Sequence, residues 1–143
     1  MRWKVPVSPI SLEKILSLTA CHPYYVNRLC RMLWDLEEAP DCEMVEHIWR
    51  QYTHAQRMDW VADVLSRLTV NQRAVLAGLS QSPEKEIRGK SFTLRLGLSS
   101  SSIQRTVGSL VLQDLVYKSD DGAYHVLNPV IRTILSEDKY FDY

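Results

Sequence analysis

The side chains best able to do chemistry are three cysteines and four histidines, and their spacing matches no usual metal-binding or catalytic pattern. Cys21, Cys30 and Cys42 are odd in number and form no Cys-x-x-Cys pair, whereas a structural metal site needs four converging ligands. The "VEHIW" segment around His47 is not the His-Glu-x-x-His pattern of zinc proteases. We therefore expect no metal site, and we expect reduced, buried cysteines in a cytoplasmic protein.

The sequence also gives no support to a catalytic nucleophile or a phosphate-binding loop. Serines are plentiful, but none lies in a Gly-x-Ser-x-Gly turn, and no histidine has a partner pattern. Glu43, His47 and Arg50 fall on neighbouring turns of an expected helix, where charged side chains usually form a solvated face. The Gly-Lys pair in "RGKS" (88–91) lacks the earlier glycine of a phosphate-binding loop. We expect no catalytic residues, and therefore no enzyme activity in this chain alone.

The strongest candidate for a binding site is the segment "SSSSIQRTVGSLVL" at residues 99–112. Ser99 or Ser100 can cap a helix, because a hydroxyl accepts from the free N–H groups of the first turn. An apolar stripe then predicts a helix over about 100–113 with Ile103, Val107, Leu110 and Val111 buried. If such a helix entered a major groove, glutamine could pair with adenine and arginine with guanine, while nearby cations held phosphates. The residues in this DNA-binding interpretation are Ser101, Gln104, Arg105, Arg95 and Lys118.

Charge and residue size favour a protein partner over DNA for the same surface. The whole chain has a formal net charge of zero. Residues 68–135 hold eight basic and five acidic side chains, an excess of three positive charges that supports only weak, non-specific binding to DNA. Carboxylates at Asp120 and Asp121, in an expected hairpin turn, would repel phosphates. Gly108 and Leu112 continue the outer face, and a glycine inside a helix costs about 1 kcal/mol relative to alanine. Such a cost is explained by a closely packed protein partner better than by a DNA groove.

The rest of the pattern predicts a mainly α fold that ends in a small two-stranded wing. We expect a helix at about 10–19, capped by Ser8 or Ser11, with Ile15, Leu16 and Leu18 on one side. In "HPYYVNRLCRMLWDLEE", the residues Val26, Leu29, Cys30, Leu33 and Trp34 form one predicted apolar stripe. Residues 41–67 form either one long helix, capped by Asp41, or two helices with a bend near residue 54.

The second half predicts three helices, a hairpin and a closing helix. The helices are "LTVNQRAVLAGLSQ", with Thr69 as its cap; "SFTLRLGL", ended by Gly97; and the helix over 100–113. "LVYKS" and "AYHVLN" are expected strands joined by the Asp-Gly turn of "DDG", and Asn128-Pro129 begins the last helix. No strand pattern appears before residue 90. This order is that of a winged helix-turn-helix domain.

The segment "TACHPYYVNRLCRMLW" (19–34) resembles T-G-G-H-P-Y-x-x-Q-x-L-C, a motif of prokaryotic AAA+ and STAND-type ATPases. In that family the motif lies in a helical lid, and its Gly-x-Pro turn approaches the adenine of the bound nucleotide. The resemblance implies a nucleotide contact at His22 and Pro23. Ala20 and Cys21 stand where the family has its two glycines.

The second half resembles the winged-helix domain that ends many of these ATPases, through "LTVNQRAVL" (68–76), "SSIQRTVGSL" (101–110) and "NP" (128–129). The two resemblances imply a helical lid-like bundle with a connector helix at 1–66, a winged-helix domain at 67–138 and a tail at 139–143. They also imply a hinge near 53–57 and an exposed apolar patch beside Pro23, Tyr24 and Tyr25.

The function expected from this resemblance is that of a non-catalytic regulatory or binding region. The chain itself would hold no cofactor, and ATP or ADP with Mg²⁺ would be bound by a missing N-terminal ATPase core. That core and a further protein are the expected partners, with no role for a membrane. The alternative is a winged-helix transcription regulator that binds operator DNA.

Overall fold

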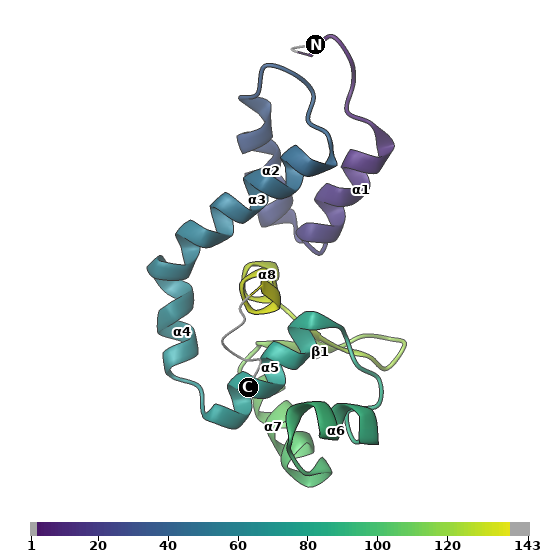
Figure 1. The fold of residues 1–143 in the computed structure, drawn as a ribbon, viewed down its shortest axis with the longest axis vertical. Helices are drawn as coiled ribbons and strands as arrows, with labels where there is room; N and C mark the ends of the chain where they lie inside the picture. The colour runs from purple at the N-terminus through teal and green to yellow at the C-terminus, as the bar shows by residue number, and fades with distance from the viewer. Residues whose placement is uncertain (1–2, 138–143) are drawn as a thin grey trace. The chain divides into compact units, whose positions relative to one another are not determined.

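The structure, a computed structural model, describes residues 3–137 and divides into two compact units, Met1–Arg57 and Met58–Tyr143 (Figure 1). The division falls inside the segment 1–66 that the sequence assigns to the first domain. The predicted tail at 139–143 lies outside the described residues.

The first unit packs three helices, α1 (Pro9–Leu18), α2 (Pro23–Trp34) and α3 (Cys42–Gln56), against one another. The predicted caps of α1 and α3 are confirmed. Ser8 Oγ accepts from the Ser11 N–H at 3.2 Å, and Asp41 Oδ1 accepts from the Met44 N–H at 2.8 Å. The Ser11 hydroxyl also donates to the Pro40 carbonyl at 3.1 Å, which ties α1 to the loop before α3.

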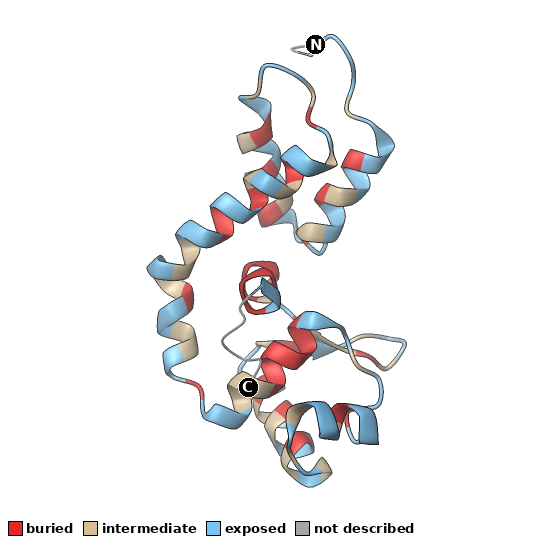
Figure 2. Cartoon of the chain, viewed as in Figure 1, coloured by how far each residue is buried: buried red, intermediate tan, exposed pale blue. Residues whose placement is uncertain are grey.

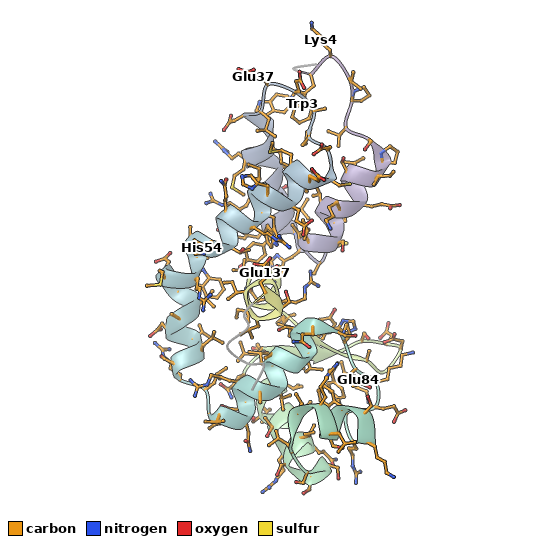
Figure 3. All side chains as sticks on the ribbon, in the orientation of Figure 1. Trp3, Lys4, Glu37, His54, Glu84 and Glu137 are labelled. Atoms are coloured by element: carbon orange, nitrogen blue, oxygen red, sulfur yellow. The ribbon has the colours of Figure 1, made fainter. Side chains whose placement is uncertain are left out.

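An indole–carbonyl contact holds the N-terminal segment against the end of α2. Trp3 Nε1 donates to the Leu36 carbonyl at 2.9 Å, and the Trp3 and Trp34 ring centroids are 5.7 Å apart. Figure 3 shows Trp3 beside the loop that carries Glu37.

The buried face of α2 differs from the predicted stripe. Tyr25, Leu29 and Leu33 are buried, whereas Cys30 and Trp34 are exposed. Residues 26, 30 and 34 lie one position further along the helix, so their side chains point about 100° away from the buried line. Tyr25 takes the buried position because its ring packs edge-on against Trp49, with 6.1 Å between the centroids.

In α1, Ile15 and Leu16 do not lie on the same side of the helix, contrary to the prediction. The Leu16 side chain is 45% exposed, while Ile15 is buried. The two side chains point about 100° apart on the helix, so only one of them faces α2 and α3.

The sequence predicted either one long helix over 41–67 or two helices with a bend near residue 54. The chain is helical without a break from α3 to residue 66, but the helix changes its form on the way. A π-helical turn at Arg57–Val61 separates α3 from α4 (Ala62–Ser66). A π turn holds one extra residue within a helix. It lies just beyond the bend expected near residue 54.

The second unit has the predicted order of helices and strands. It contains α5 (Val70–Gln81), α6 (Lys90–Leu96), α7 (Ser100–Leu112), β1 (Val116–Lys118), β2 (Tyr124–Val126) and α8 (Pro129–Glu137). Thr69 and Gln72 form a reciprocal capping box at the start of α5, and Asn128 Oδ1 accepts from the Val130 N–H at 2.8 Å at the start of α8. The mainly α fold with a small antiparallel wing is therefore confirmed.

The core of this unit lies where α5 packs against α8, α7 and the wing. Residues 75–80 of α5 are all buried, and so is most of α8, as the red segments of Figure 2 show. Among the residues that the structure describes, no helix is long and apolar enough to cross a membrane.

The wing pairs β1 with β2 in antiparallel register, Val116 opposite Val126 and Lys118 opposite Tyr124. One residue before position 90 joins it, contrary to the sequence-based expectation. The Glu84 N–H donates to the Tyr124 carbonyl at 3.3 Å, and the Tyr124 N–H donates back at 2.9 Å. A single bridging residue has no alternating pattern, which is why the sequence does not reveal it. Figure 3 labels Glu84, which lies in the connector between α5 and α6.

Candidate functional site

The helix α7 is held by a cap at one end and by three buried side chains along its inner face. Ser99 Oγ accepts from the Ser102 N–H at 3.2 Å, so the serine run begins a helix. Before it, Gly97 ends α6 with a left-handed φ of 69°. Ile103, Val107 and Leu110 are buried as predicted.

Val111 is 39% exposed, which corrects the prediction that it is buried. It follows Leu110 directly and so points about 100° away from the buried line.

The structure brings the predicted contact residues of α7 together on one outer face. Helical spacing aligns them, and each is exposed to solvent; they are Ser101, Gln104, Arg105, Gly108 and Leu112. We call these five residues the α7 face. Leu112 is 87% exposed, and a Cβ at Gly108 would meet no heavy atom within 4 Å apart from the adjoining backbone of α7 and the two neighbouring residues. The face is polar at its N-terminal end and apolar or small at its C-terminal end.

The two cations predicted to hold phosphates are engaged within the chain. The Arg95 guanidinium donates to the Gly78 carbonyl at 3.4 Å and lies 5.2 Å from the centre of the Phe92 ring. The Lys118 ammonium lies 5.6 Å from the centre of the Tyr124 ring. Each cation–π contact fixes its charge to the fold but leaves the residue exposed.

The tip of the wing is organised around a carboxylate. Asp121 accepts hydrogen bonds from the Ser119 hydroxyl and, at 3.1 Å, from the Ala123 N–H. The Ser119 hydrogen bond is the main cause that lowers the pKa of Asp121, and Lys85, 3.8 Å away, acts in the same direction. The Ser119 hydroxyl also lies 3.0 Å from His125 Nε2. Because Asp121 orders the serine and not the imidazole, this group lacks the relay of a catalytic triad.

A polar groove of about 470 Å³ runs between the start of α5 and α7. Gln72 Nε2 donates across it to Ser109 Oγ at 3.1 Å, which couples the two helices. Arg105 contributes the charged side chain among its lining residues, which are Thr69, Val70, Asn71, Gln72, Ser102, Arg105, Thr106 and Ser109.

The turn between α1 and α2 carries the second predicted site, at His22 and Pro23. Ala20 and Cys21, just before it, have φ values of 52° and 56°, in the left-handed region that glycine prefers. His22 precedes α2, Pro23 is its first residue, and the His22 ring packs 5.0 Å from the Tyr25 ring. Both predicted residues are exposed, whereas Tyr25 is buried and does not contribute to the expected apolar patch.

The expected burial of the cysteines was wrong for two of them. Cys21 and Cys30 are exposed, and Cys42 is half-buried. Cys21 ends a left-handed turn at the surface, and Cys30 lies on the outer side of α2. Partial burial of its thiol nevertheless raises the pKa of Cys30. Within residues 3–137, no three His, Cys, Asp or Glu side chains gather in a way that could hold a metal ion.

Sequence reasoning missed a group of side chains on the outer side of α2. Tyr24, Asn27, Arg28 and Arg31 line a groove of about 540 Å³. Their spacing of three and four residues could have revealed them, but it was obscured by the apolar residues interleaved with them.

A helix-turn-helix of α6 and α7 followed by a two-stranded wing defines the class of the second unit. Residues 60–137, more than half of the chain, match the model of a family described as a probable winged helix domain, and the chain belongs to this family. Neither a curated protein nor a solved structure matches the chain significantly.

Proposed function

We propose that this chain is the non-catalytic regulatory and binding region of an AAA+ or STAND-type ATPase. In this proposal the helices of the first unit form part of a lid over a bound nucleotide. The winged helix docks a protein partner or another part of the same protein through the α7 face. The family match is to a winged helix alone, so the ATPase is the part that needs a test.

The conformation of Ala20 and Cys21 carries the proposal. The resembling ATPases have glycine at both positions, and glycine reaches positive φ without the steric cost that a Cβ adds. Ala20 and Cys21 keep φ values of 52° and 56° despite their side chains. This supports a common backbone turn, in which His22 and Pro23 would approach a nucleotide. In this proposal ATP or ADP and Mg²⁺ would be held by an ATPase core outside this chain.

The α7 face fits a protein better than a DNA groove. Leu112 and, on α6, Leu94 are 87% and 80% exposed, and apolar side chains exposed to this degree gain most from contact with another protein. Asp120 and Asp121 place negative charge on the wing, where phosphates would otherwise bind. An aspartate is ionised at neutral pH, and the hydrogen bond from Ser119 lowers the pKa of Asp121 further.

One observation favours DNA binding as the second candidate. Gln104 and Arg105 lie exposed in the first half of α7, where a winged helix contacts bases, and their side chains bond to no described residue. Both residue types can make bidentate contacts with bases.

The docking half of the proposal is tested by placing a photo-crosslinking amino acid at position 112 in cells that make the full protein. We expect one discrete protein adduct, which Gly108→Trp abolishes by filling the face. A crosslinker at Met58, which is 81% exposed in the π turn, serves as the control. Adducts from position 112 no stronger than those from position 58, or adducts with DNA, would contradict docking.

The ATPase half is tested by reading the frame upstream of Met1. We expect it to encode a phosphate-binding loop, and we expect Pro23→Ala to weaken ADP binding by the longer protein. An upstream frame without such a loop, or ATP turnover by the present chain alone, contradicts the assignment.

A further inference from the structure

Two arginines on α2 have no carboxylate partner within the described chain. Arg28 and Arg31 are exposed and lie one helical turn apart, on a face that they share with Tyr24 and Asn27. We call these four residues the arginine face. Elsewhere in the first unit Glu46 pairs with both Lys14, at 3.5 Å, and Arg50, at 2.8 Å. The arginine face is therefore a concentration of positive charge that no described acid neutralises.

Arg28 is held in place by an aromatic side chain. Its guanidinium lies 5.7 Å from the centre of the Tyr52 ring and donates a hydrogen bond to the Tyr52 hydroxyl. Burial is the main cause that raises the pKa of Tyr52, whose hydroxyl is in any case protonated at neutral pH. A guanidinium has five N–H donors, and most of them remain available to a ligand. Holding the group in advance reduces the entropy lost on binding.

Tyr24 adds an apolar surface to the same face. It is 56% exposed, and its ring stands edge-on to Tyr25, with 5.0 Å between the centroids and an interplanar angle of 88°. The Asn27 amide supplies both a donor and an acceptor, which suits a peptide backbone. The face thus combines two fork-shaped cations, an ordered aromatic ring and an amide, around a groove of about 540 Å³.

We propose that the arginine face docks an acidic segment of a partner protein. Two carboxylates of that segment bind Arg28 and Arg31, and an apolar side chain packs on Tyr24. Charge complementarity carries the proposal, because planar guanidinium groups pair bidentately with carboxylates. Residues one helical turn apart have their Cβ atoms about 5–6 Å apart, so the two guanidinium groups can each bind a separate carboxylate. To bind a single phosphate, both groups would have to converge on it. The proposal does not depend on the function proposed for α7 or on an ATPase.

The test uses the full chain and a fluorescein-labelled twelve-residue peptide with the repeat Glu-Glu-Leu-Ala, followed by fluorescence anisotropy. We expect binding that weakens about tenfold or more when glutamine replaces glutamate in the peptide, since charge-assisted hydrogen bonds are lost. Arg31→Glu lowers the affinity by a similar factor. Arg31 has no side-chain partner among the described residues, so the fold is retained, and circular dichroism verifies this. Arg88→Glu is the matched control, because Arg88 is exposed in the loop before α6 and also has no side-chain partner among the described residues; it changes the affinity by less than about twofold.

Four results would overturn the proposal. The glutamine peptide could bind as well as the glutamate peptide, or neither could bind at concentrations up to about 1 mM. Arg88→Glu could weaken binding as much as Arg31→Glu, which would show that the peptide is attracted by overall charge and not by a specific site. Finally, ADP or a DNA duplex could displace the peptide, and Arg31→Glu could abolish the binding of that ligand. This would show that the arginine face binds phosphates.

Discussion

Replacing Gly108 by alanine stabilises the second unit if α7 is shaped for a partner and not for its own core. Gly108 lies in the middle of a helix of 13 residues, and a Cβ added there meets no heavy atom within 4 Å apart from the adjoining backbone of the helix and the two neighbouring residues. Its φ is not positive, so alanine fits the backbone. The expected gain is the difference in helix propensity, about 1 kcal/mol.

A second glycine provides a control with the opposite sign. A Cβ added to Gly97 also meets nothing within 4 Å, but Gly97 has a φ of 69°. The left-handed conformation costs an L-residue about 1–2 kcal/mol, so Gly97→Ala destabilises the unit. The two variants add the same methyl group to equally open space, and they differ in backbone conformation.

Amide hydrogen exchange of Ile103 and Val107 measures both effects within the second unit. We expect protection to rise about fivefold in Gly108→Ala and to fall by a similar or larger factor in Gly97→Ala. Lower protection in Gly108→Ala would mean that the glycine is needed for packing inside the chain. The reason for assigning Gly108 to a docking surface would then be lost.

Three further predictions concern local contacts. Thr69→Ala removes one half of the capping box with Gln72 and lowers the free energy of unfolding by about 1 kcal/mol, measured by urea denaturation. Cys21→Gly removes the steric cost of a left-handed φ and raises the stability of the first unit by up to about 1 kcal/mol, whereas Cys21→Ala keeps that cost and gives no gain. Urea unfolding followed by tryptophan fluorescence measures both variants. Because the pKa of Asp121 is lowered in the folded state, its contact with Ser119 stabilises the wing at every pH above 3.8, the ordinary pKa of the group. This stabilisation is lost as the pH falls through the lowered pKa. An NMR titration of the Asp121 carboxyl that gives 3.8 or more contradicts this.

The predictable parts of the fold were those that local chemistry determines. Asp41 and Thr69 were recognisable as caps because a short polar side chain before an apolar run has few other uses. At the other two helices the sequence left Ser8 or Ser11 and Ser99 or Ser100 open, and the structure has Ser8 and Ser99 as the caps. The Asp-Gly turn likewise predicted the wing.

Contacts between distant residues were not predictable from spacing. On α2, Tyr25 and Leu29 have the same helical spacing as Val26 and Cys30, so spacing does not show which pair is buried. The Tyr25 pair is buried because the Tyr25 ring packs against the rings of Trp49 and Tyr52. The five residues of the α7 face are all exposed, because periodicity alone assigns most positions of a helix to its inner or outer side.

The use of Arg95 within the fold was also hidden, because the Gly78 carbonyl that it binds is 17 residues away. The arginine face was not predicted either, because charged residues between apolar ones are typical of any solvated helix surface.

The central claim, that the winged helix serves protein contacts, is tested most directly by binding of a fluorescein-labelled DNA duplex over a range of salt concentrations. The account predicts weak binding, independent of sequence, that disappears as the salt approaches the physiological concentration. A nanomolar complex that selects one sequence at physiological salt, and that Gln104→Ala and Arg105→Ala weaken, would contradict it.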